Sequence, residues 1–115
     1  GATQADRDAV FAQLNTLRAT GLATAIAPLA ASPTTQAAAV DMLFKERAYW
    51  LFLTGHRLGD MRRLIRQYGR TAATVFPTGA MRYRPGNNYG NDVNLVIPFI
   101  ERNNPKFAGC LDRNP

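Results

Sequence analysis

Residues 46–64, ERAYWLFLTGHRLGDMRRL, constrain the fold most, because a helical pattern there carries an apolar run between charged residues. A surface helix of a globular protein has one apolar stripe and a polar face opposite it. The apolar run 49–53 instead covers every side of about one and a half helical turns. Both the charged residues and the aromatic side chains of such a helix therefore need partners.

The first forty residues predict a helix followed by a loop. Thr3 and Asp6 have the spacing of a capping box, and apolar residues at helical spacing then predict a helix over 4–19 that ends at Gly21. Pro28 interrupts the Ala-rich stretch that follows, so we expect a loop there.

A second, longer helix is predicted from the Ser32-Pro33 pair, which has the residues of an N-cap and first helical position. Its pattern continues to Tyr68, where Gly69 stops it, over about 35 residues, and a kink at Gly55 or Gly59 is expected. One face of this single helix would carry Glu46, Trp50, Leu53, Arg57, Asp60 and Leu64.

Residues 70–115 are rich in Pro, Gly and Asn, which predicts an irregular, turn-rich tail. The Pro-Gly and Asn-Asn steps at 85–88 indicate a loop. Residues 93–98 are the only strand-like run, and Pro98 limits it to a short or edge strand. The predicted fold class is therefore mainly α with a long irregular C-terminal segment.

The charge balance is basic, with 14 Lys+Arg against 8 Asp+Glu and a net charge of +6. Twelve of the cations are Arg, and the segment 45–70 alone carries seven cations against Glu46 and Asp60. Nucleic acid or an anionic membrane surface could be the partner of such a segment. We favour pairing with carboxylates from other parts of a larger fold, because the residues between the cations are too apolar for a solvated arm.

No arrangement of residues predicts catalysis or a cofactor. Ser32, His56 and Cys110 are each single and far apart in the sequence, and a lone His or Cys has structural roles more often than metal-binding ones. Glu46 and Asp60 would lie about 20 Å apart on one helix, too far for a pair of catalytic carboxylates. We therefore predict a non-enzymatic protein without a metal site.

Two stretches resemble the SusD/RagB family of outer-membrane nutrient-binding lipoproteins. The segment quoted above is similar to that family's C-terminal helix motif, and YGNDVNLVIPFIERNNP is similar to its closing segment. The first match is carried by Glu46, Arg47, Gly55, Arg57, Asp60 and Arg63. The second is carried by Tyr89, Gly90, Ile97, Pro98, Glu101, Asn104 and Pro105. Trp50, Leu51 and Thr54 depart from the pattern, and two usual acidic residues are missing.

The resemblance implies that residues 1–115 are a single partial domain, the C-terminal part of a longer SusD-like protein with a tetratricopeptide-like helical scaffold. It implies a non-catalytic, glycan-binding role at the cell surface as part of a cap on a SusC-like TonB-dependent transporter. The lipid anchor would lie upstream. The resemblance also implies a central helix that contacts neighbours on all sides, with a core formed by Tyr49, Trp50, Leu51, Phe52 and Leu53. A structural ionic network would consist of Glu46, Arg47, Arg57, Asp60 and Arg63.

No ligand-binding residue follows from the resemblance, because the family's glycan contacts lie largely upstream of the matched region. Phe76, Tyr83 and Tyr89 are loop aromatics that could stack on a sugar, although packing within the loop is the favoured role.

Two other functions stay open. A recruited structural subunit would use the apolar helix as an interface with other chains. A nucleic-acid-binding module, which we favour less, would use Arg57, Arg62, Arg63, Arg66 and Arg70.

Overall fold

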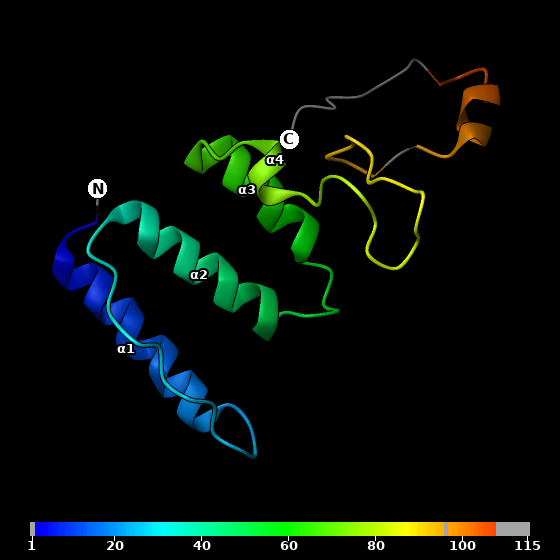
Figure 1. The fold of residues 1–115 in the computed structure, drawn as a ribbon. Helices are drawn as coiled ribbons and strands as arrows, with labels where there is room; N and C mark the ends of the chain where they lie inside the picture. The colour runs from blue at the N-terminus through cyan, green and yellow to red at the C-terminus, as the bar shows by residue number, and fades with distance from the viewer. Residues whose placement is uncertain (1, 96, 108–115) are drawn as a thin grey trace. The chain divides into compact units, whose positions relative to one another are not determined.

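The computed structural model describes residues 2–95 and 97–107, and these form a mainly helical chain without strands, which confirms the predicted class (Figure 1). Its elements are α1 (Gln4–Thr20), α2 (Gln36–Trp50), α3 (Arg57–Tyr68), α4 (Ala72–Val75) and the 3-10 helix η1 (Phe99–Asn103). None of the described helices has the length and apolar content needed to traverse a bilayer. The chain divides into two compact units, Gly1–Thr54 and Gly55–Pro115, which are described separately. The expected single partial domain stays a prediction.

Helix α1 begins where the capping box predicts. The Thr3 hydroxyl accepts a hydrogen bond from the Asp6 backbone N–H at 3.2 Å, and the Asp6 carboxylate accepts one from the Thr3 backbone N–H at 2.8 Å. Two otherwise unpaired N–H groups at the helix start are thereby satisfied. The helix ends at Gly21, whose N–H donates to the Leu17 carbonyl, so the predicted helix over 4–19 is confirmed.

The connection between α1 and α2 runs back along α1. The backbone N–H of Ile26 donates to the Arg18 carbonyl at 2.9 Å, and that of Leu29 donates to the Asn15 side-chain oxygen at 2.8 Å. Further along, the Gln4 side-chain amide donates to a carbonyl at the far end of the connection, at position 33. These contacts return the chain to the N-terminal end of α1 before α2 starts.

Helices α1 and α2 consequently lie side by side and run in the same direction (Figure 1). Tetratricopeptide units are instead helix–turn–helix pairs, so α1 and α2 do not form one, and the tetratricopeptide-like scaffold stays a prediction. The predicted start of α2 at Ser32-Pro33 is wrong. Thr35 is the N-cap, its hydroxyl accepting from the Ala38 N–H at 3.2 Å, because Pro33 is buried and held against α1.

The predicted single helix from residue 33 to 68 is also wrong, because the backbone leaves the helical conformation between Trp50 and Arg57. Leu53 and Gly55 have φ values of 60° and 82°, which lie outside the helical region. The Thr54 hydroxyl and N–H both donate to the Leu51 carbonyl, which closes the turn. The sequence located the irregularity at Gly55 but underestimated it as a kink. The single helical face predicted to run from position 46 to 64 therefore does not exist.

The core of the first unit is small. Val40 and Phe44, one helical turn apart on α2, are buried, and Glu46 is buried near them on the same helix. From α1, Phe11, Leu14 and other side chains at helical spacing are half-buried. The described part of this unit therefore places a charged group among few buried apolar side chains.

The second unit contains α3 and α4, followed by an irregular chain. Gly69 has a φ of 64° and its N–H donates to the Leu64 carbonyl, so the predicted stop is confirmed. Beyond it, the described residues form only the short helix α4, an isolated antiparallel bridge between Ala80 and Asn88, and η1. The predicted strand at 93–98 is wrong for the described residues, while residue 96 lies outside them. Loop and turn structure in this segment agrees with its Pro, Gly and Asn content.

Candidate functional site

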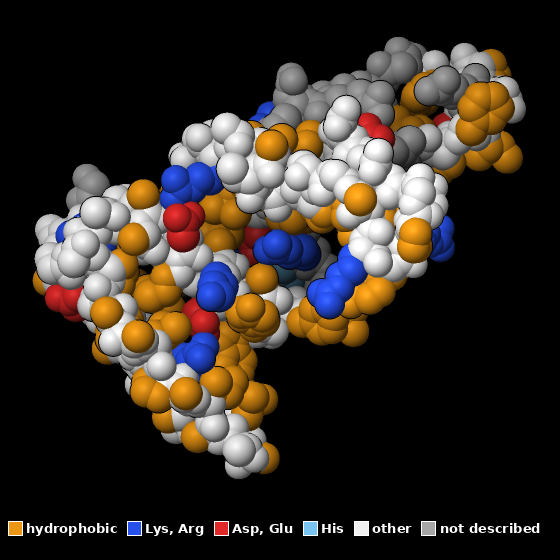
Figure 2. Space-filling view, viewed as in Figure 1, with side chains coloured by type: hydrophobic (Ala, Val, Ile, Leu, Met, Phe, Trp, Pro, Cys, Tyr) orange, Lys and Arg blue, Asp and Glu red, His pale blue; other side chains and the backbone are white. Residues whose placement is uncertain are grey.

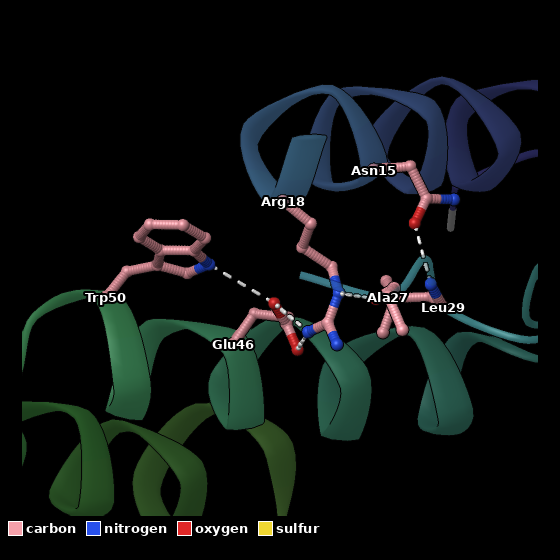
Figure 3. A network of polar contacts seen from close by, with 6 residues as sticks. All are labelled: Asn15, Arg18, Ala27, Leu29, Glu46 and Trp50. Carbon is pink, nitrogen blue, oxygen red and sulfur yellow. Dashed lines mark hydrogen bonds and ion pairs between the residues drawn. The ribbon is translucent and has the colours of Figure 1, made fainter. Parts of the chain in front are cut away.

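A buried polar site in the first unit is centred on Glu46 of α2 (Figure 3). Glu46 as a whole residue is 2% exposed. The Nη1 atom of Arg18, on α1, lies 2.8 Å from one carboxylate oxygen and 3.0 Å from the other. The indole Nε1 of Trp50, one turn further along α2, donates to Oε2 at 3.2 Å. A buried carboxylate requires such compensation, because an unpaired charge away from water is costly.

Arg18 also connects the site to the segment between the helices. Its Nε donates to the Ala27 carbonyl at 2.7 Å, so one guanidinium links α1, the connection and α2. Asn15, one turn earlier on α1, accepts the Leu29 N–H, and Figure 3 shows both links side by side. The planar guanidinium suits this task because its donors point in several fixed directions. The arrangement can hold three segments together.

Glu46 belongs to the predicted ionic network, but its partner Arg18 was not predicted. Arg18 follows Phe11 and Leu14 at spacings of seven and four residues, so it lies on the apolar face of α1. A charged residue on an apolar helical face needs a partner when that face is buried. This was the signal in the sequence that could have identified Arg18, although it does not specify which carboxylate it meets.

The other predicted network residues differ in burial. Asp60 is buried, Arg47 is half-buried, and the side chains of Arg57 and Arg63 are exposed. Asp60 lies in the first turn of α3, where a negative charge interacts favourably with the helix dipole. A network that joins all five predicted residues, Glu46 included, stays a prediction.

Within this chain, three of the five residues of the apolar run 49–53 lie outside the core, and the core that the resemblance implies for a longer protein stays a prediction. Tyr49, Phe52 and Leu53 are 67%, 72% and 89% exposed, whereas Trp50 and Leu51 are half-buried. The break after α2 carries Phe52 and Leu53 into a turn, away from the Val40 and Phe44 core. Hydrophobic side chains are visible over much of the surface in Figure 2. The exposed apolar residues at 49, 52 and 53 make the end of α2 and the turn after it a candidate interaction surface.

The loop aromatics of the second unit differ from one another. Tyr83 is 84% exposed, Tyr89 is 40% exposed, and Phe76 is half-buried. The guanidinium carbon of Arg82 lies 5.4 Å from the centroid of the Tyr83 ring, within the range of a cation–π contact. Packing within the loop, the favoured role in the sequence, therefore fits Phe76 better than Tyr83.

The described residues contain no group of three or more His, Cys, Asp or Glu side chains that could hold a metal ion. His56 precedes α3, and its carbonyl accepts the Asp60 backbone N–H at 3.0 Å. Cys110 lies outside the described residues.

Comparison with protein-family models, with curated proteins and with solved structures finds no match for this chain.

Proposed function

We propose that this chain is a non-catalytic scaffold segment of a SusD-like nutrient-binding lipoprotein at the outer membrane, part of a cap on a TonB-dependent transporter. The observation that carries the proposal is the environment of Glu46, a residue of the helix motif. It is buried and bound by Arg18 of a second helix, as a scaffold residue would be. The two motifs also occur in the order that the family has, at 46–64 and 89–105.

The exposed apolar residues are consistent with this role. Tyr49, Phe52 and Leu53 would be covered by upstream parts of a larger protein. Oligosaccharide would be the cargo, and no step of chemistry is required of the chain.

The intact mass of the natural protein, with its N-terminal sequence, tests the proposal first. Antibodies raised against this chain would isolate the protein from detergent-solubilised outer membranes of its source. We expect a mass several times 12.6 kDa, a lipidated N-terminal Cys, and a co-isolated β-barrel transporter. A protein near 12.6 kDa that lacks a lipid and a transporter would refute the proposal.

A recruited structural subunit is the second candidate, and the exposed turn at Phe52 and Leu53 favours it. This role predicts that a chain of 12.6 kDa is isolated in a defined complex with other proteins. Cross-linking from a photoreactive residue at position 52 in the native assembly would identify the neighbour. Cross-links to upstream residues of the same polypeptide would instead support the lipoprotein.

A further inference from the structure

We infer that the loop from Gly79 to Tyr89 is a binding site for an anionic oligosaccharide, such as a uronate-containing or sulfated glycan. Tyr83 would stack on a sugar ring, and Arg82 and Arg84 would pair with its acidic groups. The inference rests on the proposed function and names the class of glycan.

The base of the loop is closed by backbone hydrogen bonds. The N–H of Tyr89 donates to the Gly79 carbonyl at 2.8 Å, and the N–H of Met81 donates to the Asn87 carbonyl at 2.8 Å. The bridge between Ala80 and Asn88 lies between these bonds. A loop that is ordered before binding loses less conformational entropy when a ligand arrives.

The tip of the loop consists of two successive turns. In the first turn, the N–H of Arg84 donates a hydrogen bond to the Met81 carbonyl at 3.3 Å, and the two central residues are Arg82 and Tyr83. In the second turn, the N–H of Asn87 donates a hydrogen bond to the Arg84 carbonyl at 3.1 Å. Its central residues are Pro85 and Gly86, and the φ of 86° at Gly86 is typical of a type II turn. The sequence thus places an aromatic side chain in the first turn of the tip.

Tyr83 is suited to bind a sugar face because most of its ring is accessible. It is 84% exposed, and Arg82 lies 5.4 Å from its centroid. Aromatic rings offer a large, rigid apolar surface at low cost in side-chain entropy, while the phenol oxygen can form hydrogen bonds. The C–H groups of a pyranose can cover such a ring, and its hydroxyls can reach the exposed side chains of Asn87 and Asn88.

The charge of this region selects an anionic ligand. The loop itself, residues 79–89, contains two arginines and no Asp or Glu. Arg82 and Arg84 flank Tyr83, and a guanidinium matches the planar geometry of a carboxylate or the oxygens of a sulfate. A neutral glycan would make no use of this charge. Nucleic acid would typically be bound along a groove with successive stacking aromatics, whereas the tip carries one.

The test is titration calorimetry of the full 115-residue chain with tetragalacturonate and with its fully methyl-esterified form. The two ligands share a sugar chain and differ in charge. We expect the acid to bind, the ester to bind at least about tenfold more weakly, and the affinity for the acid to fall with added salt. Tyr83→Ala should lower the affinity for the acid about tenfold. Arg82→Gln with Arg84→Gln should reduce the preference for the acid over the ester.

Matched controls are Tyr49→Ala, an exposed tyrosine of the first unit, and Arg63→Gln, an exposed arginine of α3. Both should bind tetragalacturonate as the unmodified chain does. Equal losses in Tyr83→Ala and Tyr49→Ala, equal binding of acid and ester, or no binding of either would overturn the inference. Tighter, Tyr83-dependent binding of a thymidine oligonucleotide would overturn it in favour of nucleic acid. Co-isolation of the transporter, the test of the proposed function, does not depend on Tyr83. If the transporter is co-isolated but the titration shows no binding, only the loop site is refuted.

Discussion

Arg18→Met should destabilise the first unit by leaving the Glu46 carboxylate buried without its cationic partner. Methionine keeps much of the length and apolar volume of the arginine stem, so the loss would reflect the guanidinium rather than packing. The substitution removes Nη1 from both Glu46 oxygens, at 2.8 and 3.0 Å, and Nε from the Ala27 carbonyl at 2.7 Å. Of the contacts to the Glu46 carboxylate drawn in Figure 3, only the 3.2 Å bond from Trp50 would remain.

The expected cost follows from the burial of each partner. Removing one member of a fully buried ion pair costs about 3 to 5 kcal/mol. The Glu46 side chain is 3% exposed but that of Arg18 is 18% exposed, so water already screens part of this pair. We therefore expect a loss of about 2 to 3 kcal/mol in the free energy of unfolding. With a urea slope of about 1 kcal/mol per M, the midpoint should fall by about 2 to 3 M.

Urea titration followed by tryptophan fluorescence measures this loss directly, because Trp50 is the sole tryptophan and donates to Glu46. Circular dichroism at 222 nm reports the helices in parallel. Lys45→Met, at an exposed position of α2, is the control and should change stability by no more than about 0.5 kcal/mol. Adding Glu46→Gln to Arg18→Met removes the buried charge and should recover at least about 1 kcal/mol. If Arg18→Met and Lys45→Met unfold at the same urea concentration, the argument that Arg18 compensates Glu46 is wrong.

Three further predictions follow from local contacts. Hydrogen bonds from the Ser32 hydroxyl and the Gln4 amide lower the pKa of Asp8. Its contribution to stability is therefore present above about pH 4 and is lost as the pH falls through the lowered value. The difference in melting temperature between Asp8→Asn and the unmodified chain should be measurable at pH 7 and should shrink as the pH falls below about 4. Gly69→Ala should cost about 1 kcal/mol in urea unfolding, because φ is 64° while the space for a Cβ is open, and an unchanged midpoint would contradict this. Leu53→Asn should stabilise the chain by up to about 1 kcal/mol, because asparagine tolerates the φ of 60° at this position better than leucine does. Because Leu53 is 89% exposed, the substitution should also reduce self-association in sedimentation experiments. Unchanged stability would count against backbone strain at this position, and unchanged association would count against an apolar contact surface.

Local signals in the sequence were enough to predict where several helices begin or end. The start of α1 depends on hydrogen bonds between Thr3 and Asp6, three residues apart, and the end of α3 depends on Gly69, which adopts a positive φ. Both are properties of a few adjacent residues, so they are encoded without reference to the rest of the fold. The turns at 85–88 belong to the same class.

The break between α2 and α3 was only partly predictable. Gly55 indicated an irregularity, but Leu53 also adopts a φ outside the helical region. Leucine is a strong helix former, so the residue at this position gave no sign of the break. The helical pattern across 46–64 therefore overestimated the length of the helix. The motif residues Glu46 and Asp60 belong to two different helices as a result.

The candidate site of the first unit was decided by tertiary structure. The sequence identified Glu46 as a residue that needs a partner, but Arg18, the residue that binds it, lies 28 positions away. Their meeting depends on the connection that returns along α1, which makes α1 and α2 parallel and brings their C-terminal ends together. The sequence by itself thus determined caps, stops and charge, since these depend on neighbours within a turn of chain. The direction of α2 and the partner of its buried acid depend on the packing of distant segments, which only the folded chain defines.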